Sequence, residues 1–111
     1  MNWTDIKSES DLDYIIEKSF QTNIGVAIFK HSTRCSISSV AKKRLESSWS
    51  FNQELPAYHL DLLQYRNLSN SIAERFNIQH ESPQVLIIKN GECIYDASHL
   101  AISVKDLEFN L

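Results

Sequence analysis

Glycine, proline and cysteine are scarce in this sequence, with two of each among 111 residues. So few glycines and prolines leave no stretch with the composition of a flexible linker, and there is no internal repeat or low-complexity segment. A chain of this length is typical of one domain and can bury a core without disulfide or metal staples. We therefore expect residues 1–111 to form a single domain.

Long hydrophobic runs and dense clusters of positive charge are also missing. No apolar stretch approaches the ~20 residues of a membrane span, and the polar, acidic start MNWTDIKSESD is unlike a secretory signal. The net charge of −3 makes nucleic acid and anionic membranes poor partners. We therefore expect a cytoplasmic protein. In that reducing compartment, the two cysteines are not expected to form a structural disulfide.

Hydrophobic periodicity predicts alternating helices and strands. Apolar residues recur at helical spacing in three internal segments, and short apolar runs between them are typical of buried strands. The expected elements, in order, are a short edge strand at WTDI, a helix capped by Ser8 or Ser10, a strand at Ile24–His31, a helix from Cys35, a strand at Ala57–Leu62, a helix capped by Ser69, strands at Gln84–Lys89 and Glu92–Ala97, and a helix capped by Ser103.

This order predicts an α/β fold. The first strand–helix–strand unit should be a right-handed parallel crossover. Asn90-Gly91 suits the tight turn of an antiparallel hairpin. The expected result is a central mixed sheet of four to five strands with helices on both faces, which is the thioredoxin-like arrangement.

Cys35 lies where a buried strand is expected to end and a helix to begin. The unpaired N–H groups and the dipole of a helix start favour a thiolate over a thiol. The sulfur can accept the N–H of Ser38, as an N-cap oxygen would, and Lys30, His31 and Arg34 make the nearby charge positive. The alternative is an inert buried thiol. The polar residues on both sides of Cys35 favour a reactive one.

Ser38 stands where a dithiol redox motif would have its second cysteine. It can donate a hydrogen bond to the sulfur but cannot attack it, so a mixed disulfide on Cys35 must wait for a second thiol molecule. Cys93 cannot take that role if it follows the hairpin turn, on the order of 20 Å from Pro83 at ~3.3 Å per residue. A disulfide needs Cα atoms within about 7 Å. We expect Cys93 to pack as a strand residue.

Pro83 is expected to be the first residue of its strand, a position where its missing N–H is tolerated. An average X-Pro bond is cis in only ~5–6% of cases. The thioredoxin-like arrangement nevertheless predicts a cis Ser82–Pro83 bond beside the thiol. An ordinary trans entry to the strand is the alternative.

Four segments together resemble the YtxJ-type monothiol bacilliredoxins: KHSTRCSIS, LDLLQYRNLSNSIAERF, HESPQVLIIKNGE and DASHLAIS. These are thioredoxin-fold proteins of bacteria that make the small thiol bacillithiol. The family motif is Thr-Cys-Pro-Ile-Ser, and this chain has Arg34-Cys35-Ser36-Ile37-Ser38 with Thr33 one place earlier. Ser36 replaces the proline and so restores a helix N–H beside the sulfur.

The resemblance implies that Cys35 removes bacillithiol from mixed disulfides on client proteins. Bacillithiol is then a co-substrate, and no cofactor is tightly bound. Because bacillithiol carries carboxylates, Arg34 and Arg66 are candidates to bind it, and His80 and His99 could tune the thiol or protonate the leaving sulfur. The spacing of the cysteines and histidines does not predict a metal site.

Two other functions stay open from the sequence. One is a non-catalytic thioredoxin-fold module that buffers stress or binds a partner, in which Cys35 is merely modified. The other is a glutaredoxin-like enzyme that exchanges a different small thiol. The sequence leaves the client proteins, the reductant that clears Cys35 and the oligomeric state open.

Overall fold

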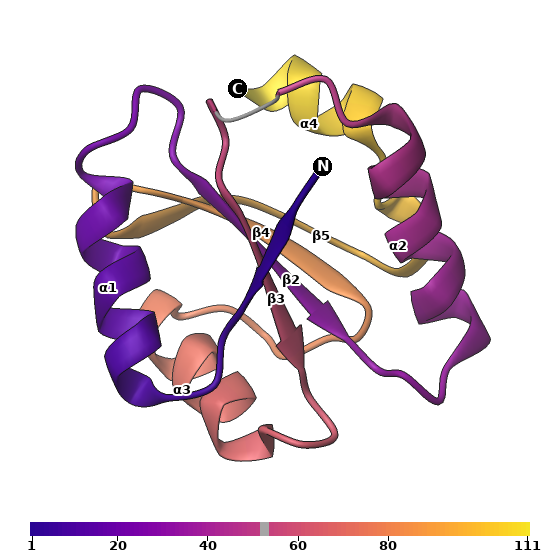
Figure 1. Ribbon diagram of the computed structural model, residues 1–111, viewed down its shortest axis with the longest axis horizontal. Helices are drawn as coiled ribbons and strands as arrows, with labels where there is room; N and C mark the ends of the chain where they lie inside the picture. Colours follow the sequence, from indigo (N-terminus) through magenta and orange to yellow (C-terminus); the bar gives the residue numbers. More distant parts are fainter. Residues whose placement is uncertain (52–53) are drawn as a thin grey trace.

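The computed structural model describes residues 1–51 and 54–111 and shows a five-stranded mixed sheet with helices on both faces (Figure 1). The fold class expected from the sequence is therefore confirmed. The elements, in chain order, are β1 (Trp3–Asp5), α1 (Glu9–Ser19), β2 (Val26–His31), α2 (Ser36–Ser48), β3 (Ala57–Asp61), α3 (Arg66–Phe76), β4 (Gln84–Lys89), β5 (Glu92–Ser98), the short 3₁₀ helix η1 (His99–Ala101) and α4 (Val104–Asn110).

The strands lie in the order β1-β3-β2-β4-β5. β1, β3 and β2 are mutually parallel, and β4 and β5 continue the sheet as antiparallel strands. The expected edge strand at the start of the chain is thus present as β1. Because β2 and β3 are parallel, their carboxyl ends lie at the same end of the sheet, where Lys30 pairs with Gln84 at the start of β4.

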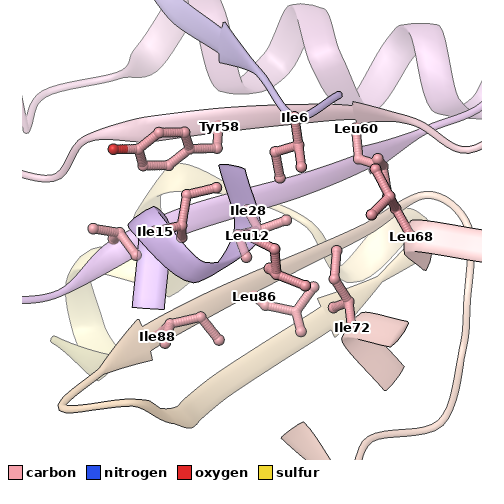
Figure 2. Close-up of a cluster of buried hydrophobic side chains, with 11 residues drawn as sticks. Ile6, Leu12, Ile15, Ile28, Tyr58, Leu60, Leu68, Ile72, Leu86 and Ile88 are labelled. Atoms are coloured by element: carbon pink, nitrogen blue, oxygen red, sulfur yellow. The ribbon is translucent and has the colours of Figure 1, made fainter. Parts of the chain in front are cut away.

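The sheet separates two hydrophobic cores. Alternate residues of β2 face opposite sides, so Val26 and Ile28 belong to one core and Ala27 and Phe29 to the other. Figure 1 shows α1 and α3 on one face of the sheet and α2 and α4 on the other. Figure 2 shows the first core, in which side chains from α1 and α3 meet those of β2, β3 and β4.

Two of the three expected serine caps agree with the structure, and α2 begins directly after Cys35, as expected. Ser8 caps α1 by accepting the N–H of Asp11, and Ser103 caps α4 in the same way. The expected cap at Ser69 is wrong, because α3 begins at Arg66 and Ser69 is buried one turn inside it. None of the helices in the described ranges is long and apolar enough to cross a membrane.

The β4–β5 hairpin turns at Asn90 and Gly91, as expected. Both residues have positive φ, 52° and 77°, which is the backbone conformation that an Asn-Gly pair adopts most readily in a two-residue turn. The hairpin brings β5 back to the end of the sheet where β2 and β3 finish, and there Ser98 pairs with Gln84.

Candidate thiol site

Cys35 is the N-cap residue of α2, four residues after the end of β2, and it is half-buried. A tight turn presents it there: its N–H donates to the Ser32 carbonyl at 3.1 Å, and its own carbonyl accepts the N–H of Ser39 at 3.1 Å. The first N–H groups of α2 therefore surround the residue that carries the thiol. Thr33, Arg34 and Ser36 flank it as exposed residues.

Ser38 has partners other than the thiol. Its hydroxyl oxygen lies 2.6 Å from His31 Nδ1 and accepts the N–H of Ser32 at 3.1 Å. The Cys35 side chain makes no capping hydrogen bond. The expectation that the sulfur accepts the N–H of Ser38 is therefore wrong. His31, at the end of a buried strand, offers the Ser38 hydroxyl a nitrogen acceptor that helix geometry alone does not reveal.

His31 is buried on the α2 face of the sheet. Burial lowers its pKa, and electrostatic interactions with His59 and Lys42 lower it further, whereas Asp61 and Glu46 act in the opposite direction. Its ring lies 5.3 Å from that of His59, centroid to centroid. These surroundings favour the neutral ring, which can accept a hydrogen bond from the Ser38 hydroxyl at Nδ1 when its proton is on Nε2.

Lys30 is fully buried on the other face of the sheet, toward α3. Its ammonium group donates to the Ser69 carbonyl at 3.2 Å and to His80 Nδ1 at 3.2 Å. Burial lowers its pKa from 10.5 to about 8. The sequence suggested that Lys30 adds positive charge beside Cys35, but its side chain leaves the strand on the face opposite to His31 and is held by α3.

The Ser82–Pro83 peptide bond is cis, as expected. Pro83 is buried and directly precedes Gln84. Because Gln84 pairs with Lys30 on the neighbouring strand β2, Pro83 lies beside His31. Its carbonyl accepts the N–H of His99 at 3.0 Å. The proline loop and the turn that carries the thiol therefore leave the same edge of the sheet.

Arg66 and His80 come together on the α3 side of this edge, and both are exposed. Burial of its ring lowers the pKa of His80, and the charges of Lys30 and Arg66 lower it further. The Nδ1 atom of His80 is turned inward, toward Lys30 and the Ser69 hydroxyl. Only the other side of the ring is thus available to a substrate.

His99 lies on the opposite side of the proline loop. It begins η1, which packs against α2, and its φ of 56° is a left-handed conformation uncommon for residues other than glycine. Its Nε2 atom is 3.5 Å from a carboxylate oxygen of Glu81. Across residues 1–51 and 54–111, no group of three His, Cys, Asp or Glu side chains is placed to hold a metal ion.

Cys93 is at the far end of the sheet, paired with Ile88 near the hairpin turn. It packs against the first core, and its S–H donates to the Tyr95 carbonyl at 3.3 Å. Burial raises its pKa from 9.0 to about 11. Both cysteines are free, and the expectation that Cys93 packs as a strand residue is confirmed.

Two contributors to this edge were missed by the sequence reasoning: the His31–Ser38 pair and the buried Lys30. A signal was present, because Lys30 and His31 are polar residues that end a strand buried on both faces. Buried polar groups need hydrogen-bond partners, so each should have been expected to bind the helix on its own face.

A half-exposed thiol at the start of a helix, at the same end of the sheet as a cis-proline loop, is the arrangement of redox proteins of the thioredoxin fold. The chain is 31% identical to a solved structure described as a candidate oxidoreductase with a thioredoxin fold, with a TM-score of 0.83 over 96% of this chain and 91% of that one. The sequence model of the monothiol bacilliredoxin BrxC family matches residues 4–107, and the chain belongs to that family.

More distant structures share the fold alone. The thioredoxin of Malassezia sympodialis is 17% identical, with a TM-score of 0.71 over 97% of this chain and 86% of that one. Oxidised thioredoxin from Plasmodium falciparum is also 17% identical, with a TM-score of 0.71 over 99% of this chain and 100% of that one. The family and the 31% identical oxidoreductase structure together support a thiol redox role.

Proposed function

We propose that this protein removes bacillithiol from mixed disulfides on oxidised client proteins, with Cys35 as the nucleophile. The observation that carries the proposal is the geometry of Cys35: a half-exposed thiol at the start of α2, with Ser38 in the place of a resolving cysteine. Cys93 is at the opposite end of the sheet and cannot serve as a substitute. A thiol without an internal resolving partner suits exchange with small thiols.

The reaction is two successive thiol–disulfide exchanges. The Cys35 thiolate attacks the bacillithiol sulfur of the mixed disulfide; a new S–S bond forms, the old one breaks, and the client leaves as a thiolate that takes up a proton. The client is thereby reduced, and Cys35 is left as a mixed disulfide with bacillithiol. A second thiol, bacillithiol itself or another cytoplasmic thiol, then attacks the bacillithiol sulfur of this disulfide. It leaves joined to bacillithiol by a new S–S bond, and Cys35 is released as a thiolate.

Exposed basic residues near the thiol suit the carboxylates of bacillithiol. Arg34 is in the turn that carries Cys35, and Arg66 begins α3 at the same edge of the sheet. A guanidinium can bind a carboxylate through two parallel hydrogen bonds. His80 and His99, on the two sides of the proline loop, are candidates to protonate the leaving client thiolate.

The test is removal of bacillithiol from a modified client protein, followed by intact mass. Cys35→Ser should abolish removal, whereas Cys93→Ser, the matched control, should keep the full rate. Multiple turnovers with excess bacillithiol are expected, and a protein that becomes modified once and then stops would be a binding module. Equal activity of the Cys35→Ser protein would end the proposal, and a preference for glutathione adducts would assign the enzyme to another small thiol.

A further inference from the structure

The Ser38 hydroxyl is held by two groups that are not the thiol. The residue is fully buried, its oxygen accepts the backbone N–H of Ser32 at 3.1 Å, and the same oxygen lies 2.6 Å from His31 Nδ1. One contact comes from the turn that carries Cys35 and the other from the end of β2. The hydroxyl thus ties the turn and the strand to the first turn of α2.

The direction of the second hydrogen bond depends on the tautomer of His31. A backbone N–H can only donate, so the Ser38 oxygen is the acceptor toward Ser32. A neutral His31 that carries its proton on Nε2 presents Nδ1 as an acceptor, and the Ser38 hydroxyl then donates its single proton to it. We take His31 to be in this tautomer.

The surroundings of His31 agree with a neutral ring. Burial lowers its pKa below the ordinary 6.5. The charged groups that face it come from β3 and from α2: His59 and Lys42 disfavour the protonated ring, and Asp61 and Glu46 favour it less strongly. With its proton on Nε2, the neutral ring holds the Ser38 hydroxyl proton in the hydrogen bond at Nδ1.

Cys35 is the N-cap of α2, and Ser38 follows three residues later in the first turn, at the spacing over which an N-cap side chain meets the helix start. We propose that His31 is a positioning residue that holds the Ser38 hydroxyl proton away from the Cys35 sulfur. A thiolate without that hydrogen bond is less stabilised and is a stronger nucleophile once formed. This inference rests on the proposed role of Cys35 as the nucleophile.

The test uses the rate of Cys35 alkylation by iodoacetamide across pH, in a Cys93→Ser background. In His31→Phe, the released Ser38 proton should turn to the sulfur and move the midpoint of the pH profile down by about one unit. Ser38→Ala alone should leave the midpoint within about 0.3 units of the wild-type value, because the wild-type hydroxyl donates no hydrogen bond to the sulfur. The double variant should match Ser38→Ala.

Two further variants separate this role from a merely structural one. His31→Asn keeps an acceptor near the Nδ1 position and should restore the wild-type midpoint. His31→Leu also lacks an acceptor, so it should show the same downward shift. It replaces His31→Phe in the test if the His31→Phe protein does not fold. An unchanged midpoint in His31→Phe and His31→Leu, or an equal shift without Ser38, would overturn the inference. Alkylation needs no bacillithiol, so failure of the proposed function would leave this result intact.

Discussion

The two ends of the sheet differ in the residues that they bury. The thiol end, where β2 and β3 finish, contains Lys30, His31 and Gln84, while the hairpin end contains the start of β2, Gly25 and the Asn90–Gly91 turn. Of the six polar or charged residues buried in the described part of the chain, five gather at the thiol end, and only Ser19 is at the hairpin end.

This difference separates the two cysteines by environment. Near Cys35, buried side chains are fixed by hydrogen bonds to the starts of α2 and α3. Near Cys93, side chains are fixed by apolar packing, and three backbone positions have the positive φ that favours glycine or asparagine. Polar groups that must stay buried are costly unless they are paired. Their concentration at one end of the sheet gives the two cysteines different surroundings, polar for Cys35 and apolar for Cys93.

The largest expected effect is in thiol reactivity. At pH 8 about one Cys93 side chain in a thousand is ionised, since its pKa is about 11. Alkylation by iodoacetamide, followed by peptide mass analysis, should modify Cys35 at least ~100 times faster than Cys93. In denaturant the two rates should become similar. Equal rates in the folded protein would remove the distinction between the two ends.

Gly25→Ala should damage stability at the hairpin end without affecting the thiol. Gly25 has a φ of 106°, and an added Cβ would lie 2.5 Å from the backbone oxygen of Ile88. We expect a loss of about 3 kcal/mol in the free energy of unfolding, measured in urea. The alkylation rate of Cys35 in the folded protein should not change.

Gly91→Ala is the matched control at the same end. Its added Cβ would meet the ring of Phe20 at 2.9 Å, and that ring is exposed and can move away. The cost should therefore be smaller than for Gly25→Ala. Equal costs would contradict the greater constraint assigned to Gly25, and a change in Cys35 alkylation with either variant would show that the two ends are coupled.

The sequence predicted elements that depend on local patterns. The alternation of helices and strands, the Asn90-Gly91 turn, the caps at Ser8 and Ser103 and the position of Cys35 at a helix start all follow from residues close together in the chain. Short-range hydrogen bonding and hydrophobic spacing determine such features. They were sufficient to place the thiol.

The pairing of buried polar groups could not be predicted in the same way. Lys30 contacts Ser69 and His80, 39 and 50 residues away, and no periodicity encodes such a contact. The start of α3 was misplaced because Ser69 resembles a cap, although its carbonyl accepts Lys30 from inside the helix. These choices depend on which side chains meet once the sheet has formed.

Lys30→Met tests the energetic cost of this polar end. In the fold, burial penalises the charged ammonium, so Met should raise the free energy of unfolding at pH 7 by about 2 kcal/mol. Between pH 8 and 10.5 the unfolded chain keeps a proton that the folded Lys30 has lost, so the Lys30 contribution to wild-type stability rises with pH. The advantage of Met should therefore shrink over that range.

The measurement is the difference between the free energies of unfolding of the two proteins in urea at each pH. This difference removes the contribution of Cys93, whose raised pKa lowers the stability of both proteins above pH 9. An advantage that stays constant with pH would contradict the lowered pKa of Lys30. A wild type more stable than Lys30→Met at pH 7 would mean that the thiol end holds its buried charge without cost.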